Sequence, residues 1–347
     1  MSIEQDTHRP AMRRGVTVVG GGAWGTTLAI LADRAGSATT LLVRDARIAE
    51  ALSQTQDHPR TLKGHILPVG VRVAALQDET FALSEVVIFA VPTQSLRAAV
   101  RACADRLDGK IVVNAGKGLE LGTLFRPTEV IAEELSGRAA STVCALSGPN
   151  LSAEIVSGLP ATAVMAACDP DTAEIARDVL MSAQFRVYTS SDVVGVEMGG
   201  ALKNIIAIGA GIGDGLNAGD NAKAAFLTRG IAEIARLGIA CGADPLTFAG
   251  LSGIGDLIAT CASPLSRNNR VGRELARGRQ LDEILAEMDE VAEGVPTTKA
   301  ARELGLRLGV ELPITSQMYE VLFAGKSPLE AVRDLMAREP KQERFNE

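Results

Sequence analysis

The glycine-rich turn at residues 20–25 limits what this chain can fold into more than any other feature. It interrupts GVTVVGGGAWGTTLAILA, a stretch of eighteen residues without a charge that runs from Gly15 to Ala32. Behind Arg13 and Arg14, such a stretch has the length of a short membrane span and the basic flank of a signal peptide. Three consecutive glycines, however, separate a β-branched run from a helix-like run. The stretch therefore predicts a strand, a tight turn and a helix, and not a membrane segment.

The spacing of the glycines within the turn predicts what the turn binds. Gly20, Gly22 and Gly25 fit the pattern G-x-G-x-x-G directly after the strand and at the start of the helix. The first glycine permits the tight turn, the second lets backbone N–H groups approach a pyrophosphate, and the third lets helix and strand pack closely. In this setting the pattern indicates a site for a dinucleotide cofactor.

The rest of the N-terminal half alternates short β-branched runs with helical patterns. Strands are expected at 15–20, 39–43, 71–75, 86–91, 110–114, 143–147, 162–166 and 185–188. Helices are expected at 24–35, 94–106, 127–136 and 171–182. The run VVIFAV at 86–91 lacks alternation, as a strand buried on both faces does. This order predicts an α/β fold with a parallel, doubly wound sheet.

From about Asp192 the strand signal disappears, and the later segments are typical of helices. These lie at 193–213, 222–238, 268–278, 281–288, 297–308, 314–324 and 328–337, with Gly or Pro at their joints. The 347 residues exceed the roughly 250–300 residues at which a single core stops growing. We therefore expect a dinucleotide-binding domain at 15–191 and an all-helical substrate and catalytic domain at 192–337, between loose ends at 1–14 and 338–347.

The net charge limits the classes of binding partner, and the cysteines indicate the cellular compartment. A net charge of −7 and a pI near 5.3 argue against a nucleic-acid or anionic-membrane partner. The apolar segment 193–213 is interrupted by Glu197 and Lys203, so no integral membrane segment is expected. The five scattered cysteines lack the spacing of a zinc or redox motif and predict buried free thiols in a reducing cytoplasm. No metal site is expected, because His58 and His65 do not fall on one helix face.

Two residues after the second predicted strand bear on the choice of nicotinamide cofactor. Arg44 and Asp45 follow the run TTLLV. An arginine here can pair with the 2′-phosphate of NADP, whereas an acid can bind the free ribose hydroxyls of NAD. NAD and NADP both remain open, and Arg44 is equally compatible with an exposed surface residue.

Lys203 is the most unusual charged residue in the C-terminal half. It lies in MGGALKNIIAIGAGIG, whose only other strongly polar residue is Asn204, and no acid lies three or four residues away on either side. Such a lysine either extends its ammonium group to solvent or is held for chemistry. Its place on the first helix after the sheet favours a position between the domains. We expect its partner to come from elsewhere in the chain, and Asp256 is the first candidate.

Two motifs in the N-terminal half follow predicted strands, at the edge where doubly wound sheets bind ligands. NAGKGLE places Lys117 between two glycines, and SGPN offers the backbone of Gly148 and the side chain of Asn150. Each is also compatible with an ordinary solvated turn.

A third polar group lies downstream, just ahead of a predicted helix. Ser266, Arg267 and Asn268 combine a hydroxyl, a guanidinium and an amide, which suits a phosphate at a helix N-terminus. The same residues fit a helix cap followed by a surface arginine.

These motifs together resemble one family. GGGAWGT, NAGKGLE, SGPN…AE, GGALKNIIAIGAGIGDGL, GLSGIGDLIATC…SRN and VAEGVPTTKA resemble, in this order over about residues 16–325, the signatures of bacterial NAD(P)-dependent glycerol-3-phosphate dehydrogenase. GGALKN and SGIGDLIATC are more specific than the glycine pattern. The resemblance implies a Rossmann-like N-terminal domain, an all-helical C-terminal domain, an active site between them, and a cytoplasmic homodimer that supplies the glycerophospholipid backbone.

The resemblance also implies roles for single residues. Lys203 matches the catalytic proton acceptor, and Asp256 matches a substrate-site carboxylate. Matches to substrate contacts are Lys117, Gly148, Asn150, Ser266, Arg267 and Asn268, of which Lys117 and Arg267 also match cofactor contacts. Further matches to cofactor contacts are Ala23, Trp24, Arg44, Ser152, Val291 and Glu293. Ser152 departs from a common alanine and Asn150 from a common Ser or Thr, and modest effects on affinity are expected.

The reaction implied is the interconversion of sn-glycerol 3-phosphate and dihydroxyacetone phosphate by hydride transfer, with Lys203 moving the C2 hydroxyl proton. A lysine pKa near 10.4 must be depressed for this, by burial and by like charges such as Lys117 or Arg267. Gly199, Gly200 and Ala207 are expected to leave room for substrate beside the amine. Two alternatives are a hydroxy-acid dehydrogenase of similar two-domain plan and a non-catalytic NAD(P)-sensing protein.

Overall fold

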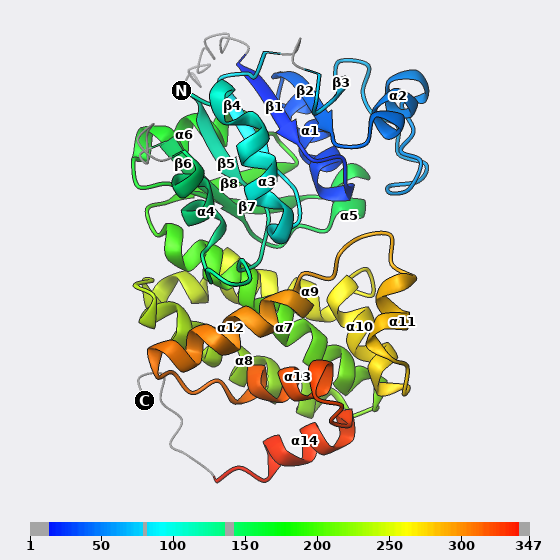
Figure 1. Cartoon of the computed structure of the whole chain (residues 1–347), viewed down its shortest axis with the longest axis vertical. Coiled ribbons are helices and arrows are strands. Elements are labelled where there is room, and N and C mark those ends of the chain that lie inside the picture. The colour runs from blue at the N-terminus through cyan, green and yellow to red at the C-terminus, as the bar shows by residue number, and fades with distance from the viewer. Residues whose placement is uncertain (1–13, 79–81, 136–141, 340–347) are drawn as a thin grey trace, which may run out of the picture.

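The computed structural model describes residues 14–78, 82–135 and 142–339. These residues form a sheet flanked by helices and, below it in the view of Figure 1, a group of helices without strands. The change between the two domains falls between β8 (Phe185–Ser190) and α7 (Val193–Gly215). The ends expected to be loose, 1–14 and 338–347, lie almost entirely outside the described residues.

The eight predicted strands are all present and form one sheet of order β3-β2-β1-β4-β5-β6-β7-β8. Besides β8 they are β1 (Gly15–Val19), β2 (Ala38–Val43), β3 (Arg72–Ala75), β4 (Val86–Phe89), β5 (Ile111–Asn114), β6 (Val143–Ser147) and β7 (Ala161–Ala166). The expectation of a parallel sheet is wrong at one edge, because β7 pairs antiparallel with β6 and β8 follows β7. The β6–β7 connection carries only a five-residue helix. At roughly 1.5 Å per residue this helix is too short to return the chain along the strand.

Helices cover both faces of the sheet. One face packs against α1 (Ala23–Arg34), α2 (Ala46–Thr55), α5 (Ser152–Val156) and α6 (Pro170–Asp178), and the other against α3 (Thr93–Cys103) and α4 (Pro127–Glu134). The strand β4 shows why its sequence lacks alternation: Val86 and Ile88 face the first layer while Val87 and Phe89 face the second. Two of the helices, α2 and α5, were not predicted. α2 buries only Ala49 and Leu52, and α5 has only five residues.

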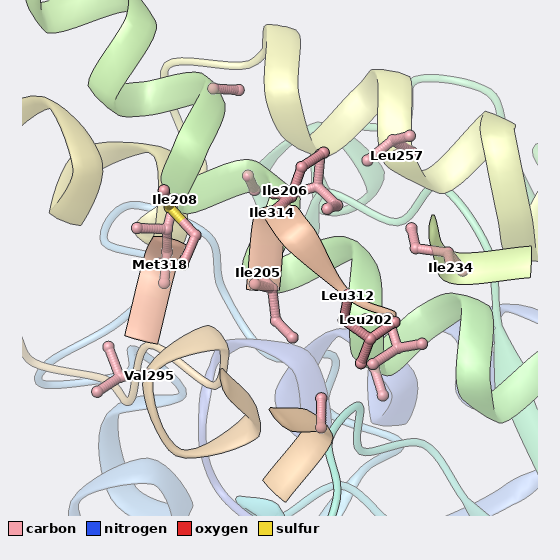
Figure 2. Packing of buried hydrophobic residues seen from close by; sticks show 14 of the residues in the cluster. Leu202, Ile205, Ile206, Ile208, Ile234, Leu257, Val295, Leu312, Ile314 and Met318 are labelled. Atoms are coloured by element: carbon pink, nitrogen blue, oxygen red, sulfur yellow. The ribbon is translucent and has the colours of Figure 1, made fainter. Parts of the chain in front are cut away.

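The C-terminal domain is built around α7. The helices around it are α8 (Asp220–Ala240), α9 (Asp256–Ala262), α10 (Arg267–Ala276), α11 (Leu281–Ala286), α12 (Gly294–Leu308), α13 (Pro313–Phe323) and α14 (Pro328–Met336). Figure 2 shows Leu202, Ile205, Ile206 and Ile208 of α7 among apolar side chains from α8, α9, α12 and α13. The seven predicted helical segments are present. The prediction missed α9 and the turns that precede it, η3 (Pro245–Ala249) and the π-helical η4 (Leu251–Gly255).

The burial of α7 explains its apolar composition. Among the described residues it is the one helix long and apolar enough to cross a membrane, and 89% of its most apolar window is buried inside the protein. A helix that is buried on all sides in a protein core is apolar on every face, so it has the same composition as a membrane-spanning helix. Contacts with α8, α9, α10, α12 and α13 place α7 in the core.

The cysteines differ in part from the prediction of buried thiols. Cys103, Cys144 and Cys261 are buried and unpaired, but Cys241 is half-buried and Cys168 is exposed. Cys168 lies on the connection between β7 and α6, and connections of this kind run over the surface.

A buried carboxylate on α7 fastens the two domains together. Glu197 accepts hydrogen bonds from Arg126 Nη1 at 2.7 Å, from the Thr128 backbone N–H at 2.9 Å and from Thr128 Oγ1 at 2.6 Å. Its side chain is 2% exposed. Burial raises the pKa of Glu197, while the Arg126 guanidinium and the Thr128 hydrogen bonds oppose that shift. The carboxylate therefore satisfies the first turn of α4 from the neighbouring domain.

We expect Glu197→Ala to lower the free energy of unfolding by about 3 kcal/mol, because it removes the buried acceptor of the Arg126 guanidinium and of the Thr128 N–H and hydroxyl. Urea denaturation followed by far-UV circular dichroism measures this. The matched control is Glu129→Gln, since exposed Glu129 pairs with the same Arg126 at 3.1 Å. Its expected cost is below about 1 kcal/mol. Equal effects of the two substitutions would contradict the role assigned to Glu197.

Candidate active site

The turn between β1 and α1 has the backbone geometry that a dinucleotide site requires. Gly20 has a φ of +127°, which side chains rarely permit, and a Cβ on Gly25 would overlap the carbonyl oxygen of Gly20. At Gly22 a Cβ would meet only the Glu290 carboxylate within 4 Å, at 3.0 Å. The first and third glycines are thus needed by the turn itself, whereas the second leaves an opening beside the helix N-terminus.

A carboxylate oxygen lies in the opening beside Gly22. The backbone N–H of Ala23, in the first turn of α1, donates a hydrogen bond of 2.7 Å to Glu290 Oε1. Helix N-termini bind anions through such N–H groups and the positive end of the helix dipole. The carboxylate stands in for a phosphate oxygen, so the turn fits the pyrophosphate of a dinucleotide.

A buried histidine supports the same turn. His58 Nε2 donates to the carbonyl oxygen of Gly21 over 2.6 Å, while Nδ1 accepts the backbone N–H groups of Thr61 at 2.9 Å and Arg60 at 3.2 Å. This pattern places the ring proton on Nε2. His58 therefore positions the turn, a role that its sequence context does not reveal.

The second part of the site is a buried network around Lys203. Lys203 Nζ donates to the Asp256 carboxylate and, at 2.6 Å, to Thr260 Oγ1. Lys117 Nζ contacts the other oxygen of Asp256 at 2.6 Å and the Gly148 carbonyl oxygen at 2.8 Å. Lys203 is 6% exposed and Asp256 is 1% exposed. The expectation that Asp256 would be the partner of Lys203 is confirmed, and Lys117 joins them from the sheet domain.

Glycines on α7 bring the contributing elements together. A Cβ on Gly199 would overlap the Ser252 carbonyl oxygen of η4, and one on Gly200 would lie 2.5 Å from Ser147 Oγ. The space beside Gly199 and Gly200 is therefore filled by protein, and the expectation that these glycines leave room for substrate is wrong. They let η4 and β6 approach α7, which places Asp256 opposite Lys203.

The environment of Lys203 tunes its acidity. The pKa of Lys203 is lowered from 10.5 to about 8, because burial and the like charge of Lys117 together outweigh the opposing effect of Asp256. The result is an amine that changes its charge close to neutral pH, which is the condition for proton transfer.

Two polar atoms beside this network lack partners. Ser147 Oγ and Asn150 Oδ1 are buried without a hydrogen bond, although Asn150 Nδ2 donates to the Thr162 carbonyl oxygen at 2.9 Å. Buried polar atoms are normally satisfied, so unpaired ones mark a place where a ligand can bind. Both atoms flank the strand end from which Gly148 holds Lys117.

The Ser266-Arg267-Asn268 group begins α10, but two of its side chains are already engaged. Ser266 caps the helix by accepting the Asn269 N–H at 3.2 Å. Asn268 is buried; its Nδ2 donates to Asn204 Oδ1 and its Oδ1 accepts the Gly294 N–H, both over 3.0 Å. Arg267 is half-exposed, donates to the Val291 carbonyl oxygen at 3.1 Å and lies 3.4 Å from Glu290. Only Arg267 has its charged group accessible to an anion.

Glu293, just before α12, links the helical domain to α3 of the sheet domain. Its Oε1 accepts the Thr93 backbone N–H at 3.0 Å, and burial raises its pKa to about 6. Its Oε2 and the hydroxyls of Thr93 and Thr297 are buried without partners around Gly118, where a Cβ would meet all three. These orphaned atoms are a second place suited to a ligand amide or hydroxyl.

The remaining candidates lie outside the lysine network. Trp24 Nε1 donates to the Ala115 carbonyl oxygen at 3.0 Å, so its ring spans the carboxyl edge of the sheet. Arg44 is exposed, Asp45 caps α2 through the Arg47 N–H at 2.9 Å, and Ser152 is the first residue of α5.

Several residues at this site were not predicted from the sequence. Thr260 lies one helical turn after Asp256, a spacing that could have identified it as a second partner of Lys203. His58, Thr93 and Glu290 lie on connections or at helix starts, where no periodic pattern predicts which atoms they approach. Among the described residues, no cluster of three or more His, Cys, Asp or Glu side chains could hold a metal ion.

A glycine turn that fits a dinucleotide and a buried lysine whose pKa is lowered to about 8 are the two parts that a nicotinamide-dependent oxidoreductase needs. The family model for the N-terminus of NAD-dependent glycerol-3-phosphate dehydrogenase matches residues 15–173, and that for its C-terminus matches residues 192–333. The chain belongs to the NAD-dependent glycerol-3-phosphate dehydrogenase family.

Individual relatives agree with this assignment. Glycerol-3-phosphate dehydrogenase [NAD(P)+] of Chlorobium luteolum is 47% identical over 330 residues, covering 95% of this chain and 99% of the relative. The protein of the same name from Prosthecochloris aestuarii is 48% identical, with coverages of 94% and 99%. The crystal structure of glycerol-3-phosphate dehydrogenase from Coxiella burnetii superposes with a TM-score of 0.88 at 30% identity and covers 94% of this chain and 99% of that one.

Proposed function

We propose that this protein is an NAD(P)-dependent sn-glycerol-3-phosphate dehydrogenase, with Lys203 as its proton-transfer group. The observation that carries the assignment of Lys203 is its buried contact with Asp256 and Thr260, in a network that Lys117 joins from the sheet domain. Membership of the family supports the substrate pair, sn-glycerol 3-phosphate and dihydroxyacetone phosphate.

The residues divide the work between proton transfer and orientation. When bound, NAD(P) supplies the acceptor or donor of the hydride at C2. In the oxidising direction, neutral Lys203 accepts the proton of the C2 hydroxyl. In the reducing direction, the Lys203 ammonium polarises the carbonyl oxygen and then donates its proton to it. Asp256 holds the amine in place, and its carboxylate offsets one of the two positive charges that Lys117 and protonated Lys203 carry.

Other residues would hold the cofactor and the substrate phosphate. The turn at Gly20, Gly22 and Ala23 suits the pyrophosphate, and Trp24, Arg44, Ser152, Val291 and Glu293 complete the proposed cofactor contacts. The guanidinium of Arg267 and the buried polar atoms beside Lys117 suit the phosphorylated substrate. Arg44, which is exposed at the end of β2, suits either a 2′-phosphate or solvent, so both NAD and NADP are proposed as cofactors.

A spectrophotometric assay tests the proposal. The oxidation of NADH and NADPH is followed with dihydroxyacetone phosphate and, in parallel, with a panel of keto acids. Turnover confined to the phosphate ester is expected. D-mandelate dehydrogenase shares this fold with a TM-score of 0.56 at 9% identity, so the fold alone is compatible with a hydroxy-acid substrate. Turnover of keto acids without turnover of the phosphate ester would overturn the proposal.

The pH dependence of the rate should reverse with the direction of the reaction. The pKa of Lys203 in the ligand-free protein is lowered to about 8, so kcat/KM for glycerol 3-phosphate oxidation should rise as pH increases through 8 and then level off. For dihydroxyacetone phosphate reduction, kcat/KM should fall as pH increases through the same value. Initial rates at substrate concentrations below KM, from about pH 6 to about pH 10 and so roughly two units on either side of that pKa, measure this. Profiles that are parallel in the two directions would contradict proton transfer by Lys203.

The proposed setting is metabolic. A soluble dehydrogenase of this kind would act in the cytoplasm as a homodimer and would supply the glycerol phosphate backbone for phospholipid synthesis. Analytical ultracentrifugation of the purified chain tests the dimer directly.

A further inference from the structure

The loop between α11 and α12 reaches from the helical domain to the start of α1. In Figure 1 it is the orange segment that rises from α11 toward the sheet domain before α12 begins. Glu290 lies on this loop, and its Oε1 accepts the Ala23 N–H over 2.7 Å across 267 residues of sequence. The loop therefore brings a carboxylate to the glycine turn.

The carboxylate occupies the position where an anion is best stabilised. Gly22 has no Cβ to block it, and a Cβ there would lie 3.0 Å from Glu290 Oε1. The α1 helix has twelve residues, and its dipole favours a negative charge at this end. The same N–H groups are those that a dinucleotide pyrophosphate uses.

An arginine holds the carboxylate from its other side. Arg267 Nη1 lies 3.4 Å from Glu290 Oε2 and donates to the Val291 carbonyl oxygen at 3.1 Å. Glu290 is only partly exposed, with 23% of its side chain accessible. The negative Glu290 carboxylate thus lies between two positive groups, the N-terminus of α1 and the Arg267 guanidinium, and this arrangement links the two domains.

We propose that Glu290 is an internal competitor for the cofactor pyrophosphate and sets the affinity of the enzyme for NAD(P). This inference rests on the proposed function, because it takes the glycine turn to be the cofactor site. Binding of the pyrophosphate requires the Glu290 carboxylate to leave the Ala23 N–H, since two anions cannot share one donor. The departure frees the Arg267 guanidinium from its carboxylate partner at the same time.

The competition has a quantitative consequence. The apparent Kd for the cofactor equals the intrinsic Kd divided by the fraction of molecules in which the site is open. A charged hydrogen bond of this kind holds most molecules closed, so removing the charge should tighten binding by about five- to tenfold. Inorganic pyrophosphate, which offers the same anion without the nucleosides, should show a shift in the same direction.

Equilibrium titration tests this without any turnover. Wild type, Glu290→Gln and Glu290→Ala are titrated with NADH and with NADPH, and the nicotinamide fluorescence gives Kd. Pyrophosphate binding is followed by calorimetry, and thermal unfolding of the cofactor-free proteins is recorded in parallel. Asp289→Asn removes the same charge from the exposed neighbouring residue and is the matched control.

The two Glu290 variants should bind both cofactors more tightly than wild type, while Asp289→Asn should not. Their cofactor-free forms should unfold at the same or a lower temperature, because α1 loses an anion at its N-terminus. A residue that merely stabilises the fold would instead weaken binding as it destabilised the protein. Unchanged or weaker binding by Glu290→Gln, with wild type binding normally, would overturn the inference. No binding of either cofactor by wild type would overturn the proposed function itself, and the inference with it.

Discussion

Replacing Lys203 with methionine should lower kcat by roughly 10³-fold in both directions while leaving the fold intact, because it removes the group that moves the C2 proton. Methionine keeps the length and the apolar stem of lysine in a position that is 6% exposed. The Thr260 hydroxyl retains its 3.2 Å hydrogen bond to Asp256, so that carboxylate is not left without a partner. Initial rates of NADH or NADPH oxidation with saturating dihydroxyacetone phosphate measure the loss.

The control separates chemistry from folding. Lys326→Met removes a lysine from another lysine–aspartate ion pair, that with Asp334, which lies on α14 and is exposed. It should retain the wild-type kcat. Cofactor Kd and unfolding temperature should stay close to wild type in Lys203→Met, because Lys203 is not among the proposed cofactor contacts. Near-normal turnover in a well-folded Lys203→Met protein would show that another group transfers the proton.

Asp256→Asn should produce the second-largest effect, a loss in kcat/KM of about 10²-fold together with a shift of the pH profile. Asp256 is 1% exposed and lies between two ammonium groups, so its removal leaves Lys203 and Lys117 without a shared anion. Asp256 raises the pKa of Lys203, and its loss should move the midpoint of the oxidation profile below 8. The reduced rate follows because the amine loses the contact that orients it.

Lys117→Met should shift the pH midpoint in the opposite direction from Asp256→Asn. Lys117 lowers the pKa of Lys203, so this substitution should move the same midpoint above 8. Rates of glycerol 3-phosphate oxidation across the pH range give both midpoints. Shifts in the same direction in the two variants would contradict the assignment of charges around Lys203.

Both substitutions also bear on stability, with a sign that follows from linkage. The folded-state pKa of Lys203, about 8, is below its ordinary value of 10.5, so the folded protein binds fewer protons between these values. Stability attributable to this group therefore increases as pH rises from about 8 toward 10.5. In Asp256→Asn the folded-state pKa of Lys203 is lower still, so the pH range over which stability increases begins at a lower pH. The loss of stability relative to wild type should therefore be larger at about pH 6 than at about pH 9, roughly two units below and one unit above the wild-type pKa.

Much of this architecture could be predicted because local patterns encode it. All eight strands, the glycine turn and the long helices follow from hydrophobic periodicity and from the positions of Gly and Pro. The buried pair of Lys203 and Asp256 could be proposed because a lysine without local partners in an apolar helix requires one from elsewhere. The short elements α2, α5 and α9 were missed, although short helices such as α11 and α14 were predicted.

The predictions that were wrong share one physical cause. Contact between distant segments depends on the direction of the backbone and on single atoms, and neither produces a periodic pattern in the sequence. The reversal at β7 follows from a connection too short to cross the sheet, and the approach of η4 to Gly199 turns an apparent space into a contact. Periodicity thus determined which segments are strands and helices and that Lys203 needed a distant partner. The three-dimensional packing decided that Lys117 and Thr260 complete that partnership, that His58 supports the glycine turn and that Glu290 reaches α1. Each of these contacts joins atoms that are far apart along the chain, and their distance in space is defined only when the chain has folded.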